Sequence, residues 1–168
     1  MPHQGRRGRR GTRASALRRG GGAALAVLAT LAACSEWPRD PEGTLERARG
    51  GLLRAGAAEA PPFVVRGPDG RPAGPEPELV EAFARSIGAR VDWRWGGSDE
   101  LLRALQEREL DVAAVGLTSK TPWSTHVGIT RPWSKQHGEE RVLAVAAGEN
   151  ATLVALDRVI EARRRPGR

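Results

Sequence analysis

The sequence predicts an α/β fold, with a mostly parallel sheet flanked by helices. Short apolar runs such as Val112–Val115 indicate buried strands, because a strand covered on both faces needs no polar alternation. Elsewhere apolar residues recur at helical spacing, as Leu79, Phe83 and Ile87 do. Strands and helices of this kind alternate along the chain, which predicts right-handed crossovers between parallel strands.

The first predicted strand covers residues 52–58, after a helical lead-in that Gly50-Gly51 interrupts. Pro68-Asp69-Gly70 then predicts the turn of a short β-hairpin, because proline presets φ, aspartate caps the turn and glycine accepts a positive φ. A helix is expected from the Gly74–Pro77 segment to Gly88, which suits the left-handed conformation that ends a helix.

The middle of the chain predicts a strand, a helix and a second strand. Val91, Trp93 and Trp95 alternate with polar residues, which is the period of a half-buried strand. Ser98 is expected to cap the next helix. The strand at residues 112–115 follows that helix.

The last part of the chain is expected to return to the same sheet. Residues 134–140 are polar and are predicted to form a loop. The apolar run Val142–Val145 predicts another strand, and a final helix follows it. The apolar side of this helix consists of Leu153, Leu156, Val159 and Ile160.

Residues 1–33 predict a secretory signal peptide. Seven arginines precede an apolar run at residues 23–33, which is shorter than the about 20 residues that a membrane-spanning helix needs. The run ends in Leu31-Ala32-Ala33-Cys34, which resembles the lipobox of bacterial lipoproteins, where the cysteine thiol takes a diacylglycerol. Cys34 is therefore the predicted lipidation site. The alternative is a coincidental Ala-Ala-Cys with a free thiol.

The net charge of +7 belongs to this leader. The chain of 168 residues has 27 basic and 20 acidic residues, and the leader contributes seven arginines and no acidic residue. The remainder is neutral, so nothing in it favours a nucleic acid as a partner. Cys34 is the only cysteine, which excludes an internal disulfide.

Four short motifs occur in order along the chain. Gly74–Leu79 is similar to G-F-x-x-D-L, and Leu105–Val112 to L-x-x-G-x-x-D-V. Gly116-Leu117-Thr118 matches G-x-T, and Thr130–Trp133 matches S/T-x-P-Y. With these motifs the chain resembles the bacterial extracellular solute-binding proteins of family 3, the periplasmic amino-acid-binding type. The resemblance implies a periplasmic-binding-protein-like fold and non-catalytic recognition of an amino acid or another small polar solute for an ABC transporter.

The sequence departs from the family in two places. The family's chain crosses into a second lobe after the position of Trp133, but here only residues 134–141 precede the next strand. We therefore expect the first lobe only, without closure of two lobes around a ligand. The family also carries an arginine five residues after the Thr of G-x-T, which pairs with a ligand carboxylate. Here that position is Trp123, which places amino-acid binding of the family type in question.

The resulting domain prediction has four parts. Residues 1–33 are the signal peptide, 34–43 a flexible tether, 44–165 a single solute-binding-protein-like lobe and 166–168 a tail. The protein is expected in the cell envelope, periplasmic or extracytoplasmic, and anchored to the membrane by lipid. Its expected partners are a small-molecule solute and a membrane permease or another envelope protein, with no nucleic acid.

The candidate ligand shell consists of residues at the predicted carboxyl ends of strands. An aromatic pair would stack on or cover the ligand, and hydroxyl and N–H groups would hold an anionic or carbonyl oxygen. Core packing is the alternative for Phe63 and Trp95, and packing at the surface is the alternative for Trp123. The predicted ligand-binding residues are Phe63, Trp95, Thr118, Ser119 and Trp123.

No catalytic residues, metal site or cofactor are predicted, because the sequence has no metal-ligand spacing, P-loop or dinucleotide fingerprint. Three functions remain open. The first is solute recognition, and the second is an interaction or scaffold lipoprotein that has lost solute binding. The third is an enzyme on the same fold, such as a dehydratase, for which no acid–base pair is evident.

Overall fold

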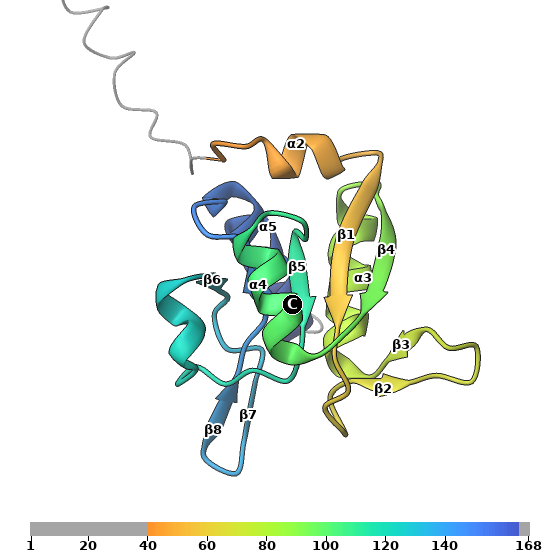
Figure 1. Ribbon diagram of the computed structural model, residues 1–168, viewed down its shortest axis with the longest axis vertical. Helices are drawn as coiled ribbons and strands as arrows, with labels where there is room; N and C mark the ends of the chain where they lie inside the picture. The colour runs from red at the N-terminus through yellow and green to blue at the C-terminus, as the bar shows by residue number, and fades with distance from the viewer. Residues whose placement is uncertain (1–39, 165–168) are drawn as a thin grey trace, which may run out of the picture. The chain divides into compact units, whose positions relative to one another are not determined.

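The computed structural model describes residues 40–164, which form an α/β domain around a five-stranded sheet (Figure 1). The strand order is β4-β1-β5-β9-β6, with β1 parallel to both β4 and β5. β9 runs antiparallel to β5 and β6. These strands are β1 Leu52–Ala57, β4 Arg90–Trp95, β5 Val112–Ala114, β6 Gly128–Ile129 and β9 Ala144–Val145. The α/β prediction is confirmed, and the structure adds an antiparallel edge.

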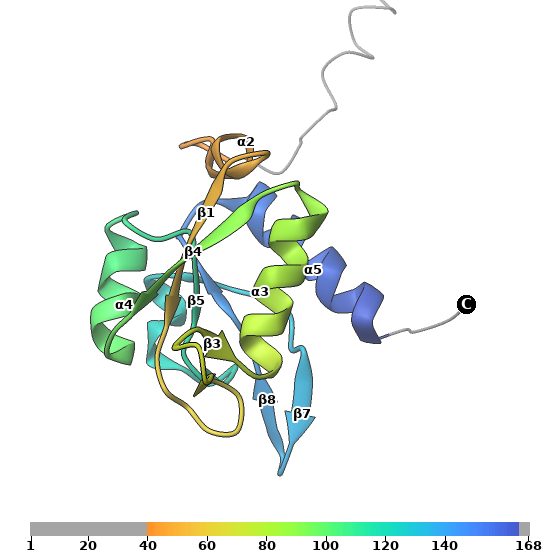
Figure 2. The same cartoon turned by 90° about the vertical axis from the view of Figure 1, so that its right-hand side faces the viewer.

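Helices cover both faces of the sheet (Figure 2). α3 and α5 lie side by side on one face and α4 lies on the other. A short helix, α2, precedes β1. The bounds are α2 Thr44–Ala48, α3 Pro75–Ser86, α4 Ser98–Gln106 and α5 Asn150–Arg164, with a 3-10 turn at η2 Pro122–Thr125.

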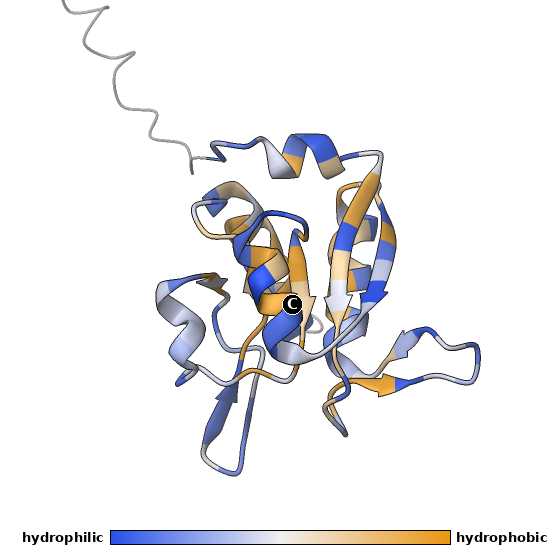
Figure 3. Cartoon of the chain, in the orientation of Figure 1, coloured by the Kyte–Doolittle hydropathy of each residue, from blue (hydrophilic) through white to orange (hydrophobic). Residues whose placement is uncertain are grey.

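Alternating side chains of the strands divide the core into two hydrophobic clusters. Ala55 and Ala57 of β1 pack with α3 and α5, whereas Gly56 faces α4. A Cβ at Gly56 would lie 2.9 Å from a methyl carbon of Leu110 and 3.1 Å from one of Leu101. The small residues that make β1 a weak strand in sequence therefore allow close packing of both helical layers. Figure 3 shows hydrophobic residues along β5 and much of β1.

The predicted helices occur where their apolar periodicity places them, but one cap differs. α4 begins at Ser98 with Gly97 as its N-cap, and no side chain caps it. The predicted cap at Ser98 is therefore wrong, because this residue is already helical. At the end of α3, Gly88 has φ 69°, as expected of the residue that ends a helix.

Two hairpins project beyond the ends toward which β1 and β4 point (Figures 1 and 2). The predicted hairpin is present as β2 Val65–Arg66 and β3 Pro72–Ala73. The second, β7 Ser134–Gln136 and β8 Glu139–Arg141, replaces the loop predicted for residues 134–140. That prediction is wrong because His137 and Gly138 both adopt positive φ, 51° and 81°, which closes a tight two-residue turn.

The chain returns directly from this hairpin to the sheet. β9 pairs with β5, and Leu156 and Ile160 of α5 are fully buried in the cluster on the α3 side. Between Trp133 and Val142 the described chain contains the hairpin and no second lobe. The predicted signal peptide, Cys34 and the tail at residues 166–168 lie outside the described residues.

Hydrogen bonds attach the segment before α2 to the domain. The carboxylate of Asp40 accepts a bond from the Leu45 amide at 2.7 Å. The Glu149 carboxylate accepts bonds from the Glu42 and Thr44 amides, each at 3.4 Å. Arg108 donates to the same carboxylate at 2.7 Å. Residues 40–44 are thereby held at the amino-terminal side of β1.

Candidate functional site

The carboxyl ends of the parallel strands bring five residues from separate segments together, which is the part of an open α/β sheet where ligands bind. We call this cluster the Phe63 site. Its members follow β1, open α3, follow β5, precede β7 and end β8, and they are Phe63, Glu76, Gly116, Trp133 and Arg141.

Phe63 forms the aromatic centre of this site. The residue is 7% exposed, and its ring meets the Trp133 ring edge-on, with centroids 5.9 Å apart. The loop that carries it is fixed by a close approach of backbone. Gly74 has φ 111°, and a Cβ there would lie 2.6 Å from the carbonyl oxygen of Phe63. A glycine before α3 therefore determines where the ring lies.

Arg141 places its guanidinium over the face of Phe63, with the central carbon 4.3 Å from the ring centroid. Nη1 donates to the carbonyl oxygen of Gly116 at 3.1 Å, and Nη2 donates to Glu139 Oε2 at 2.9 Å. The side chain is 18% exposed. Within residues 40–164, its buried Nε has no hydrogen-bond partner.

Glu76 adds a fully buried carboxyl group from the first turn of α3. Its Oε2 accepts a hydrogen bond from the Gly116 amide at 3.0 Å, whereas Oε1 has no partner in the described part of the chain. Burial raises the pKa of Glu76 to about 7, and the Gly116 amide, the charge of Arg141 and the Val115 amide oppose this rise. Gly116 is thus bonded on both sides, to Glu76 through its amide and to Arg141 through its carbonyl.

Three of the predicted ligand-binding residues lie at or beside this site. Phe63 is its centre, and Thr118 lies opposite Arg141 in an isolated antiparallel bridge. Ser119 is fastened to the second hairpin: its amide donates to the Glu140 carbonyl at 2.8 Å and its hydroxyl to Glu140 Oε2 at 3.3 Å.

The other two predicted residues lie elsewhere. Trp95 donates from Nε1 to the Gly70 carbonyl at 2.9 Å, and Arg66 stacks on its ring at 4.1 Å, so it supports the first hairpin. Trp123 packs with the α4 cluster, and its ring meets that of His126 edge-on at 5.9 Å. Because Phe63 belongs to the cluster on the opposite face, these two aromatic rings do not form the expected pair.

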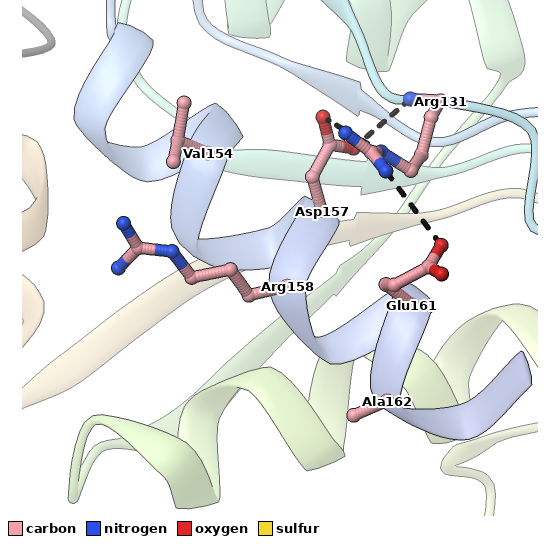
Figure 4. Close-up of a pocket in the computed structure, with 6 residues that line it drawn as sticks. All are labelled: Arg131, Val154, Asp157, Arg158, Glu161 and Ala162. Atoms are coloured by element: carbon pink, nitrogen blue, oxygen red, sulfur yellow. Dashed lines mark hydrogen bonds and ion pairs between the residues drawn. The ribbon is translucent and has the colours of Figure 1, made fainter. Parts of the chain in front are cut away.

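Arg131 belongs to the Thr130–Trp133 motif, and its side chain is ion-paired with α5 (Figure 4). Its amide donates to Asp157 Oδ1 at 2.9 Å, and its guanidinium lies 3.5 Å from Asp157 Oδ2 and 3.6 Å from Glu161 Oε2. These residues line a hollow of about 490 Å³ along α5, together with Val154, Arg158 and Ala162. Arg131 is thereby engaged away from the Phe63 site.

Sequence reasoning missed Arg141 and Glu76 as site residues. A signal for Arg141 exists in His137-Gly138, since a dipeptide that accepts positive φ predicts a hairpin whose second strand ends near the sheet. Glu76 has no such signal. It resembles an ordinary acidic residue at a helix start until the fold buries it against Gly116.

The chain belongs to the bacterial extracellular solute-binding proteins, family 3, whose model matches residues 53–161. This match covers the sheet, the Phe63 site and most of α5. It defines the domain as a solute-binding one. No curated protein has a sequence that matches this chain.

Solved structures support a single lobe. The arginine-bound form of domain 1 from TmArgBP is 24% identical, with a TM-score of 0.61 over 68% of this chain and 94% of that one. A mutant of ArgBP from T. maritima is 15% identical, with a TM-score of 0.61 over 72% of this chain and 93% of that one. EhuB in complex with hydroxyectoine is 28% identical, with a TM-score of 0.50 over 56% of this chain and 37% of that one. The first two likenesses show the fold of one domain.

Two further features concern other chemistry. In residues 40–164, no group of three or more His, Cys, Asp or Glu side chains is placed to hold a metal ion. None of the described helices is long and apolar enough to cross a membrane.

Proposed function

We propose that the protein is an extracytoplasmic lipoprotein whose single family 3 lobe recognises a small polar solute at the Phe63 site. The observation that carries this proposal is the position of Phe63. It holds an aromatic face at the carboxyl ends of the strands, beside a guanidinium and a buried carboxyl group, and Thr118 pairs with Arg141 through the backbone. An aromatic face with a few convergent polar groups is the usual composition of a small-ligand site.

Amino acids and related small solutes are the first ligands to test. Support comes from the arginine-bound domain 1 and from the hydroxyectoine complex, whose ligands are small and carry both charges. The residue at the family's carboxylate-pairing position is Trp123, so a bound amino acid would need another partner for its carboxylate. The hydroxyl and amide of Thr118 are the proposed groups, because Ser119 already donates both its amide and its hydroxyl to Glu140.

Binding by one lobe is expected to be weak. A single lobe contacts one side of a ligand, whereas small-molecule sites of high affinity bury most of the ligand's surface. We expect dissociation constants above about 10 μM, equivalent to less than about 7 kcal/mol. In this proposal the lobe delivers its solute to a membrane permease of the ABC type while Cys34 keeps it at the membrane.

Isothermal titration calorimetry of the protein with a panel of amino acids, betaines and small carboxylic acids tests this function. Phe63→Ala is expected to abolish binding of any solute that the wild type takes. Trp123→Ala is the matched control and is expected to leave binding unchanged, because Trp123 packs on the α4 face. Nanomolar binding by the monomer would contradict weak single-lobe recognition.

The proposed anchor has its own test. Mass spectrometry of the mature protein is expected to show an N-terminal cysteine that carries a diacylglycerol, with residues 1–33 removed. Cys34→Ser is expected to lose the lipid mass and the partition into detergent. An unmodified thiol at Cys34 would refute the anchor without affecting the solute-binding proposal.

A second candidate is a scaffold lipoprotein that no longer binds solute. The observation in its favour is that Arg141 already covers the face of Phe63. Crosslinking and copurification from detergent-solubilised membranes separate the two functions. A stoichiometric envelope protein, retained in Phe63→Ala and accompanied by no solute binding, would favour the scaffold.

A further inference from the structure

The surroundings of the Arg141 guanidinium are those of a cation-binding site. An aromatic face lies 4.3 Å from its central carbon, a backbone carbonyl accepts a hydrogen bond at 3.1 Å, and the Glu139 carboxylate accepts another at 2.9 Å. Aromatic faces, carbonyl oxygens and carboxylates all favour a positive charge, and their attraction strengthens where water is excluded. The cation that they hold here belongs to the chain itself.

Arg141 fills this site incompletely. Glu76 is fully buried beside the same Gly116, yet its Oε1 has no hydrogen-bond partner among the described residues. The Nε of Arg141 is buried without a partner as well. No ion pair joins the two side chains within residues 40–164, although Arg141 acts electrostatically on Glu76. A buried acceptor and a buried donor are therefore both left unmet, which is costly.

The origin of the mismatch lies in the backbone. Arg141 ends β8, and its main chain is held on both sides: its carbonyl accepts from the Trp133 amide of the hairpin at 2.9 Å, and its other side pairs with Thr118 in an isolated bridge. Its side chain reaches the site from this fixed point. A guanidinium or ammonium group on a free solute carries no such restraint, so it can satisfy Glu76 while lying over Phe63.

We propose that Phe63, Glu76 and Gly116 form a recognition site for a guanidinium or alkylammonium group, and that Arg141 occupies this site in cis and competes with cationic solutes. This inference rests on the proposed solute-binding function and names both a substrate class and an internal competitor. A solute binds only in molecules from which Arg141 has withdrawn. Its apparent association constant is therefore the intrinsic constant multiplied by the fraction of such molecules.

A second stacked arginine in the structure shows which features matter. Arg66 lies over the Trp95 ring at 4.1 Å and pairs with Glu59 at 3.3 Å, but both partners of that ion pair are largely exposed. In the described part of the chain no fully buried carboxyl group is bonded at this stack, in contrast to Glu76. Arg66 is therefore the matched control: it has the same residue type and the same kind of aromatic contact, without the buried acceptor.

The test is a titration of the full chain, purified in detergent, with three probes that differ at one end or the other. Arginine carries a guanidinium and a carboxylate, agmatine carries the guanidinium without the carboxylate, and citrulline replaces the guanidinium by a neutral urea. Arg141→Ala is expected to bind agmatine and arginine about tenfold more tightly than the wild type, as expected if Arg141 fills about nine-tenths of the sites. Citrulline is expected to show no gain.

Three further variants complete the design. Phe63→Ala in the Arg141→Ala background is expected to lose the gain, and Arg66→Ala is expected to match the wild type. Arg141→Gln keeps a polar side chain of similar reach and is expected to behave as Arg141→Ala, which covers the case in which alanine unfolds the domain. Carbon-13 NMR of Glu76 gives a direct readout: agmatine is expected to lower the pKa of Glu76 in the Arg141→Ala protein, and citrulline is not.

Two results would overturn the inference alone and leave the proposed function standing. One is an Arg141→Ala protein that binds agmatine no better than the wild type while both still bind another solute. The other is a loss of solute binding in Arg141→Ala, which would make Arg141 an anchor for a ligand anion. If neither protein binds any probe or any solute of the panel, the inference and the proposed function fail together.

Discussion

At the scale of single residues, Glu76 is the group whose chemistry the fold changes most. Its position in the first turn of α3 is typical of a solvated acidic residue, but it is fully buried. One oxygen is bonded to Gly116, and the other has no partner within residues 40–164. Its pKa rises from 4.5 to about 7, first because burial disfavours the charged form. The same group therefore makes domain stability depend on pH.

The expected pH dependence follows from the direction of this shift. Between pH 4.5 and 7 the folded protein retains the Glu76 proton that the unfolded chain has released, so the free energy of unfolding falls as pH rises. The loss is on the order of 3 kcal/mol by pH 7.5. Urea unfolding of wild type and Glu76→Gln from pH 4.5 to 7.5 measures it. The difference between the two proteins cancels other groups, such as Asp40, whose pKa burial and Glu149 raise to about 6.

Glu78→Gln is the control for this measurement, because Glu78 is exposed on the same helix. It is expected to follow the wild-type curve. A Glu76→Gln protein with the full wild-type decline would show that Glu76 does not keep its proton in the folded state.

Gly74 supports a second prediction at this scale. Alanine at this position combines a φ of 111° with a Cβ 2.6 Å from the Phe63 carbonyl, so we expect a loss of about 3 kcal/mol in unfolding free energy. Gly70→Ala is the matched control. Its φ is also positive, 78°, but nothing lies within 4 Å of the added carbon, so about 1 kcal/mol is expected. Equal losses in the two variants would refute the close approach at Gly74.

At the scale of elements, α5 forms part of the hydrophobic core of the lobe. It packs beside α3 and contributes Leu156 and Ile160, both fully buried, to the cluster that also contains Phe63. The loop after β6 is attached to the same helix through Arg131 and Asp157. The return segment thereby joins the sheet edge, the helical layer and the candidate site.

Leu156→Ala tests this role of α5. Removal of a fully buried leucine is expected to cost about 2–5 kcal/mol of unfolding free energy, because it leaves a cavity between α3 and α5. Val154→Ala on the outer side of the same helix is expected to cost less than about 1 kcal/mol. Chemical denaturation measures both. A Leu156→Ala protein as stable as Val154→Ala would mean that α5 is not packed on the lobe in solution.

At the scale of the whole molecule, both hydrophobic clusters lie within residues 40–164 and share the strands of one sheet. Along β1, Leu53, Ala55 and Ala57 belong to one cluster while Gly56 faces the other, so loss of this strand would disrupt both clusters. A chain with this connectivity is expected to unfold as a single cooperative unit.

Residues 34–168 with Cys34→Ser are therefore expected to unfold in one transition. Circular dichroism reports the helices. Tryptophan fluorescence reports Trp37 together with Trp93, Trp95, Trp123 and Trp133, and these last four lie on both faces of the sheet. Coincident curves in urea are the expected result. Two separated transitions would contradict the shared core.

Sequence predictions that depend on short-range patterns are accurate, whereas those that depend on contacts between distant segments are not. The Val112–Val115 strand, the helix after Gly74 and the apolar face of α5 depend on periodicity and local turns, and the structure confirms them. The second hairpin was missed because its strands are polar and only its turn is diagnostic. Trp123 and Phe63 were expected to act together, but residues that follow different strands can point to opposite faces of one sheet.

By itself the sequence determined the class of fold, the family and the expectation of one lobe, because these depend on motifs and apolar spacing along the chain. Only the tertiary structure decided the composition of the site. Arg141 and Phe63 are far apart in sequence, and Glu76 and Gly116 likewise, yet they meet within hydrogen-bond or stacking distance. The reason is physical: the stability of a charged side chain depends on the groups buried beside it, and burial is a property of the packed chain.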